Sequence, residues 1–125
     1  MNSARLSIAV IQILCLISAI ILHEVSHGLV ALWCGDDTAR KAGRLTLNPA
    51  PHIDLFGSII VPAMGALSGI AVIGWAKPVP INPARMKNPR RDSLIVGLAG
   101  PASNLVLMAT SAVIARVWFQ SLSTP

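Results

Sequence analysis

A long apolar run near the start of the chain, Leu6–Trp33, constrains the fold more than any other feature of this sequence. As a helix it would be about 42 Å long, which is enough to cross a bilayer with some tilt. The run also contains the pentapeptide HEVSH at residues 23–27. Ionisable side chains inside a membrane span are costly and usually mark a functional site. The sequence therefore predicts a membrane helix that carries a polar site.

The spacing of the two histidines in this pentapeptide indicates what the site can hold. His23 and His27 are four residues apart, so on a helix they lie on one face, one turn apart. That spacing lets both imidazoles reach one Zn²⁺, and Glu24 lies close enough to act on a water at the metal. We therefore predict His23 and His27 as zinc ligands. Glu24 is predicted as the general base, which takes a proton from water and returns one to a leaving amine.

Composition indicates that lipid solvates much of the chain. The 125 residues are 54% hydrophobic and 12% charged, too apolar for one soluble domain of this length. The net charge is +5, and eight of the ten Lys and Arg fall between Arg40 and Arg91, beside apolar segments. No aromatic side chains are interleaved with these charges as a base-stacking surface requires. The expected partner is a lipid bilayer, and nucleic acid is not expected.

A second membrane span is predicted at Ser93–Phe119. Pro101 lies inside it and cannot donate a hydrogen bond to the carbonyl of Gly97, so we expect a kink there. Asn104 places an amide within the membrane, where polar groups are few and usually have partners. Its amide could bond a neighbouring helix or hold the backbone of a substrate.

The apolar segment between these spans, residues 55–75, is interrupted by glycines and Pro62 and has basic residues on both sides. Because positive charge favours the cytoplasmic face, both flanks are expected there, which a single crossing cannot achieve. A re-entrant hairpin shielded by protein is the preferred interpretation, and a true span remains the alternative. The expected protein is multi-pass in the cell membrane, with residues 23–27 in the cytoplasmic half.

Two polar segments are expected to form a short β or extended region on the cytoplasmic side. Leu45 and Leu47 alternate with polar residues, which predicts a short strand before the turn at Asn48-Pro49. Four prolines between residues 78 and 89 favour extended chain and exclude a continuous helix. Residues 77–81 could therefore offer backbone groups to an extended peptide or serve as a stiff linker. The predicted fold class is a mainly α polytopic membrane protein.

Several motifs together resemble the site-2 protease family of intramembrane zinc metalloproteases, in its short branch without a PDZ domain. They cover most of the chain in the order of the family: HEVSH (23–27), GDDTARKAGRLTLNPAPHID (35–54), GWAKPVPINP (74–83), NPRRD (88–92) and GPASN (100–104). The resemblance implies a zinc-dependent endopeptidase that cleaves peptide bonds in or near transmembrane segments of protein substrates. It also implies that residues 1–125 form the N-terminal part of a single membrane-embedded peptidase domain.

One feature of the family is missing from this sequence. Members take a third zinc ligand from an aspartate in an Asn…Pro…Leu-Asp-Gly motif on a later helix, and no such motif occurs here. Asp54 is the best internal substitute, whereas Asp36 and Asp37 are expected to face the cytosol. The expectation is a fragment or truncated product that lacks the third ligand. An inactive pseudoprotease, or a protein that binds membrane segments, is the alternative.

Overall fold

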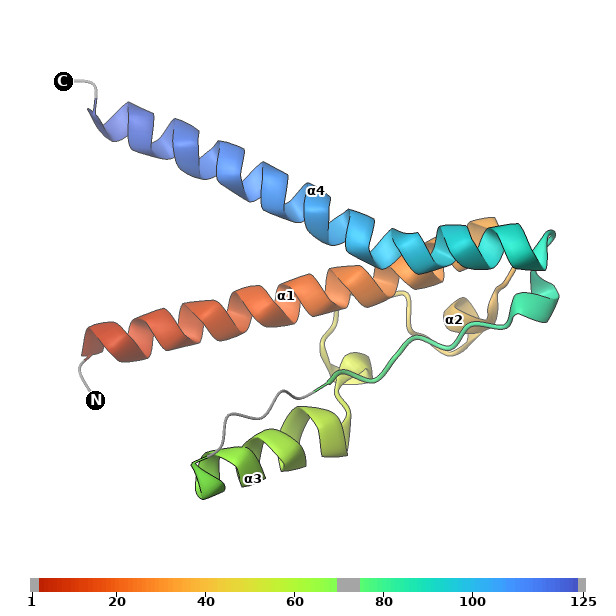
Figure 1. Cartoon of the computed structure of the whole chain (residues 1–125), viewed down its shortest axis with the longest axis horizontal. Helices are drawn as coiled ribbons and strands as arrows, with labels where there is room; N and C mark the ends of the chain where they lie inside the picture. Colours follow the sequence, from red (N-terminus) through yellow and green to blue (C-terminus); the bar gives the residue numbers. More distant parts are fainter. Residues whose placement is uncertain (1–2, 70–74, 124–125) are drawn as a thin grey trace.

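The computed structural model describes residues 3–69 and 75–123, which are mainly helical. Two long helices dominate: α1 (Ser3–Trp33) and α4 (Pro89–Ser123). Both are long and apolar enough to cross a membrane, which confirms that the two predicted segments are long apolar helices. Helix α1 begins three residues before its predicted start and ends at Trp33 as predicted, whereas α4 extends beyond its predicted segment at both ends. They run antiparallel, with both chain termini at the same end of the molecule (Figure 1).

Short elements connect the two long helices and lie beside α1 (Figure 1). Most of them begin or end at a Pro, Gly or side-chain cap, because these residues interrupt a regular helix. Among the described residues they are α2 (Thr38–Lys41), the 3₁₀ turn η1 (Ala50–His52), the π-helix η2 (Leu55–Ile60), α3 (Val61–Ser68) and the 3₁₀ turn η3 (Pro83–Arg85).

The strand predicted around Leu45 and Leu47 is wrong. The chain bends at residues 45–47, and the described part of the molecule contains no strand. The hydrogen bonds of Thr46 explain the bend: its hydroxyl accepts from the backbone N–H of Asn48 at 3.1 Å, and its carbonyl lies 2.9 Å from His52 Nε2. A lone extended segment without a neighbouring strand gains no ladder bonds, so these local bonds prevail.

The apolar segment 55–75 begins as one continuous helical stretch, η2 followed by α3, and α3 ends where Gly69 adopts a left-handed conformation with φ +69°. The 14 residues of η2 and α3 together would form a helix about 21 Å long, which is shorter than the ~30 Å hydrocarbon thickness of a bilayer. The two ends of the segment meet, since Trp75 N–H donates to Gly57 O at 3.1 Å and Ser58 Oγ donates to Trp75 O at 2.8 Å. The prediction for residues 70–74 lies outside the described residues.

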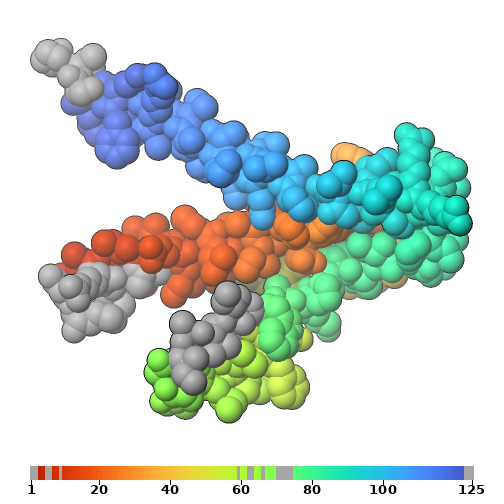
Figure 2. Space-filling model, in the orientation of Figure 1, coloured from red at the N-terminus to blue at the C-terminus, as the bar shows by residue number. Residues whose placement is uncertain are grey.

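The helix pair is packed at one end only. Ala31, Met86 and Val96 form a buried cluster where the C-terminal half of α1 meets the first half of α4. Beyond this region the helices diverge (Figure 2), and large apolar side chains such as Leu14 and Val113 are exposed. Figure 1 shows α4 changing direction along its course, as expected for a helix with Pro101 in its interior. The packed end is where the HEVSH motif lies.

Candidate metal centre

The two histidines of the motif face each other across a gap that suits a metal ion. His23 and His27 lie one turn apart on α1, and their Nε2 atoms are 3.1 Å apart. The rings are nearly perpendicular, with an interplanar angle of 80° and centroids 4.7 Å apart. Two imidazole nitrogens bound to one tetrahedral Zn²⁺ lie about 3.3 Å apart, since each Zn–N bond is about 2.0–2.1 Å. The pair therefore fits zinc as two of its ligands.

Helix α4 sets the orientation of the His27 ring. His27 Nδ1 lies 2.6 Å from the backbone carbonyl of Val96. A carbonyl can only accept a hydrogen bond, so Nδ1 carries the proton and Nε2 presents its lone pair. An outer hydrogen bond of this kind is what orients and fixes the tautomer of a metal-binding histidine. The second long helix therefore prepares His27 to bind through Nε2.

Gly100 provides the space for both rings. A Cβ atom at this position of α4 would lie well inside van der Waals contact with the Nε2 atoms of His23 and His27. Asn104, one turn later on the same helix, reaches the other side of His23, with its Nδ2 atom 3.2 Å from His23 Nδ1. The backbone of α4 thus forms one wall of the centre, and only glycine at residue 100 leaves that wall open.

Glu24 is held by an extended segment, residues 76–82, which runs past α1. The Val79 N–H donates to Glu24 Oε2 at 2.9 Å, and Val79 itself is buried. A carboxylate can accept several hydrogen bonds, so this contact fixes the direction of the carboxylate and leaves it capacity to bind water. Gly28, one turn further along α1, allows the close approach, because a Cβ there would lie 3.1 Å from the Val79 side chain.

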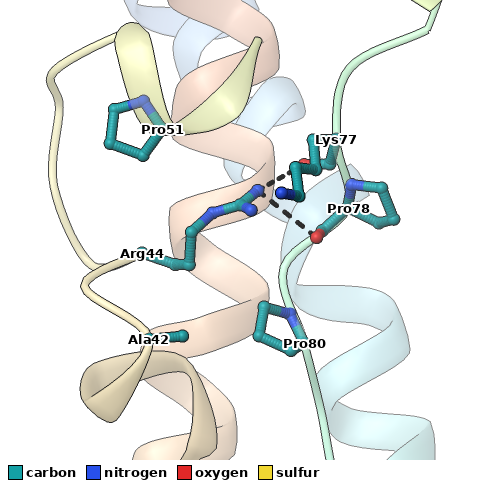
Figure 3. Close-up of a pocket in the computed structure, with 6 residues that line it drawn as sticks. All are labelled: Ala42, Arg44, Pro51, Lys77, Pro78 and Pro80. Carbon is teal, nitrogen blue, oxygen red and sulfur yellow. Dashed lines mark hydrogen bonds between the residues drawn. The ribbon is translucent and has the colours of Figure 1, made fainter. Parts of the chain in front are cut away.

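Buried charged groups anchor this extended segment on both sides of Val79. On one side, Arg44 donates through Nη2 to the carbonyls of Lys77 and Pro78, at the edge of an open pocket of about 410 Å³ (Figure 3). On the other side, the Asn82 N–H donates to Asp36 Oδ2 at 2.6 Å. Arg44 and Asp36 are both buried. These anchors fix the position of the Val79 N–H that holds Glu24.

Asp36 is fully buried, contrary to the expectation that it faces the cytosol. Burial opposes ionisation of its carboxyl, but hydrogen bonds from Thr38 and Asn82 outweigh it and lower the pKa below the usual 3.8. The neighbouring Asp37 forms ion pairs with Lys41 at 2.7 Å and with Arg85 at 2.5 Å. The hydrogen bond from Lys41 is the largest of the effects that lower the Asp37 pKa. Both aspartates therefore stabilise the fold as anions.

No described residue is brought to the two histidines as a third ligand. Within residues 3–69 and 75–123, no three His, Cys, Asp or Glu side chains are grouped so as to hold a metal ion. Asp54, the substitute suggested by the sequence, instead caps η2, where its Oδ1 accepts from the Gly57 N–H at 2.7 Å. The described residues thus supply two candidate zinc ligands and a candidate base.

Sequence reasoning missed the parts of the centre that come from outside the motif. The Val79 N–H and the Val96 carbonyl are backbone groups, so the residue types at these positions do not indicate that they bond to Glu24 and His27. Gly100 is the first residue of the GPASN motif, but the motif does not reveal that the residue leaves space for the two imidazole rings. That depends on how α4 packs against α1. The burial of Arg44 could not be predicted either, because the sequence shows only that this residue lies in a basic loop.

The chain is similar in sequence to two curated bacterial proteins. It is 44% identical over 102 residues, or 82% of its length, to "Putative zinc metalloprotease YwhC" of Bacillus subtilis. It is 39% identical over 89 residues, or 69% of its length, to "Putative zinc metalloprotease Rip2" of Mycolicibacterium smegmatis. The aligned regions cover 43% and 32% of those relatives, so the chain spans less than half of either. No family model matches the chain. No solved structure matches it.

Proposed function

We propose that this chain, a member of the site-2 protease family, forms the zinc-and-base part of a membrane-embedded metalloendopeptidase. One observation carries the proposal: the Nε2 atoms of His23 and His27 face each other at 3.1 Å beside the open wall at Gly100. This arrangement suits zinc, and the names of the relatives point to the same metal and reaction class. The proposed substrate is a protein segment in or near the membrane.

The membrane arrangement that we propose follows from charge and from the meeting ends of residues 55–75. Eight Lys and Arg lie between residues 40 and 91, at the packed end of the helix pair, which the positive-inside rule assigns to the cytoplasm. The centre then lies in the cytoplasmic half of the bilayer. The hydrogen bonds that join Trp75 to Gly57 and Ser58 favour a re-entrant hairpin over a span for the segment between the long helices.

In this proposal the chain's own residues orient water and move protons. His23 and His27 would hold zinc, which would supply Lewis-acid chemistry when bound. Glu24, fixed through Oε2 by the Val79 N–H, takes a proton from the attacking water and gives it to the nitrogen of the scissile peptide bond as that bond breaks. Because a helical substrate protects its own backbone bonds, the substrate must be unwound locally before it is cut. The third ligand is proposed to come from outside the 125 residues.

The test is a Glu24→Gln substitution in the intact protein, purified in lipid nanodiscs and assayed with a membrane-protein substrate. Removal of a general base should lower cleavage about 10²–10⁴-fold. Zinc content, measured by atomic emission, should stay at the wild-type level, because Glu24 is not a ligand. His27→Ala should lose zinc. Persistent cleavage in the Gln variant would overturn the assigned mechanism, and zinc-loaded wild-type protein that cuts nothing would favour a binding protein instead.

A further inference from the structure

The hydrogen bonds around the two histidines form one chain of donors and acceptors. Since His27 Nδ1–H donates to Val96 O, His27 Nε2 must accept from His23 Nε2–H at 3.1 Å when no cation lies between them. His23 Nδ1 is then without a proton and accepts from Asn104 Nδ2 at 3.2 Å. In this arrangement the side-chain oxygen of Asn104 is buried and has no hydrogen-bond partner.

Zinc requires the opposite tautomer of His23. Both Nε2 atoms must present lone pairs to the metal, so the proton of neutral His23 must sit on Nδ1 and needs an acceptor. Rotation of the Asn104 amide by half a turn would bring Oδ1 to the place of Nδ2 and supply that acceptor. The same rotation would give the unpartnered oxygen its hydrogen bond. No proton is lost from the pair, because the proton of His23 moves from one ring nitrogen to the other.

We propose that Asn104 is a positioning residue for zinc: its amide selects the tautomer of His23. With Nδ2 toward the ring, the histidines bond to each other, and with Oδ1 toward the ring, both are ready for the metal. The inference rests on the proposed zinc site. Beyond that site, we infer that the Asn104 amide fixes the tautomer of His23, just as the Val96 carbonyl, two turns earlier on α4, fixes the tautomer of His27.

The test measures zinc affinity and tautomer separately from proteolysis, in the intact protein in nanodiscs. Asn104→Leu keeps the branching of the side chain at Cγ but offers no acceptor, and its zinc affinity, measured by chelator competition, should fall about 10–100-fold. Asn104→Asp keeps an acceptor oxygen and should retain the wild-type affinity. Ser103→Ala is the matched control, because the Ser103 hydroxyl bonds only within α4, to Gly100 O at 2.7 Å, and its affinity should not change.

Nitrogen NMR of ¹⁵N-histidine supplies a signature that a packing role would not produce. The His23 signals, assigned with His23→Gln, should report Nε2–H without metal and Nδ1–H with zinc. The inference is overturned if Asn104→Leu binds zinc as the wild type does, if the Leu and Asp variants lose affinity equally, or if His23 keeps one tautomer throughout. If the zinc affinities and tautomers are as expected but the protein cleaves nothing, the result would count against the proposed function and not against the role of Asn104. If the wild-type protein has no affinity for zinc, the proposed function and the role of Asn104 would both be overturned.

Discussion

The two ends of the α1–α4 pair differ in packing and polarity, although both are built from the same two helices. At one end the helices pack closely, and two histidines of α1 meet an asparagine and a backbone carbonyl of α4, while Glu24 bonds to the extended segment 76–82 beside them. At the other end they diverge, and most of their exposed side chains are apolar, as Leu14 at 58% exposed and Val113 at 63% illustrate. Most polar groups of the packed end have protein partners, whereas the apolar end has surface suited to lipid.

This difference follows from where backbone and polar side chains can be satisfied. In hydrocarbon an unpaired polar group costs several kcal/mol, so ionisable residues are placed only where other protein groups can bond to them. His27 and His23 each have such a partner on α4, and Glu24 has one in the extended segment 76–82. The apolar end needs no such partners. Variants that disturb the two ends should therefore differ in kind as well as in size.

The largest effect is expected at Gly100, in the packed end. Gly100→Ala places a methyl group against both imidazoles and should lower zinc affinity and cleavage about 100-fold. Gly97→Ala on the same helix is the matched control, since among the described residues no atom outside its own stretch of helix backbone lies within 4 Å of its added Cβ. It should leave zinc affinity unchanged. If both variants lowered zinc affinity equally, the cause would be the replacement of a glycine in α4 and not the loss of space beside the imidazole rings.

Asp36→Ala should have the next largest effect, this time on stability. It leaves the backbone N–H groups of Thr38 and Asn82 without their acceptor, which should lower the free energy of unfolding by about 2–3 kcal/mol. Because Asn82 ends the segment that holds Glu24, cleavage should also fall. Thermal unfolding in nanodiscs measures the first effect. Full retention of stability would mean that Asp36 is not an anchor of the packed end.

Acidification should weaken the same anchor. The folded-state pKa of Asp36 is lowered below 3.8, so its contribution is present above that value and is lost as pH falls through the folded pKa. The unfolding temperature should therefore drop from about pH 5 downward, with the largest change below the ordinary carboxyl pKa. Asp36→Asn should flatten this dependence. A profile that is the same in both proteins would assign the acid sensitivity to other groups.

The smallest effect is expected from a matched pair of valines on α4. Val96 is 3% exposed in the packed cluster, and Val113 is 63% exposed at the apolar end. Val96→Ala should lower the free energy of unfolding by about 1–2 kcal/mol, because it removes buried methyl groups. Val113→Ala should change it by a few tenths at most. A cost at Val113 as large as at Val96 would indicate that another protein segment packs there.

Part of this architecture could be predicted from local sequence. The long apolar helices α1 and α4 were predicted because long apolar runs need no tertiary information to be recognised. The strand near Leu45 was not predicted correctly, because a strand depends on a pairing partner that an alternating pattern cannot supply. The burial of Asp36 was also missed, since its hydrogen-bond partner, Asn82, lies 46 residues away.

For the candidate centre, the sequence by itself determined the spacing of the two candidate ligands and of the candidate base, because both are set by the pitch of one helix. Tertiary structure decided the rest: which nitrogen of His27 is free, where Glu24 points, and that only glycine fits at residue 100. These features depend on backbone groups of α4 and of residues 76–82. Backbone groups are the same in every residue, so their placement is decided only when the chain has folded.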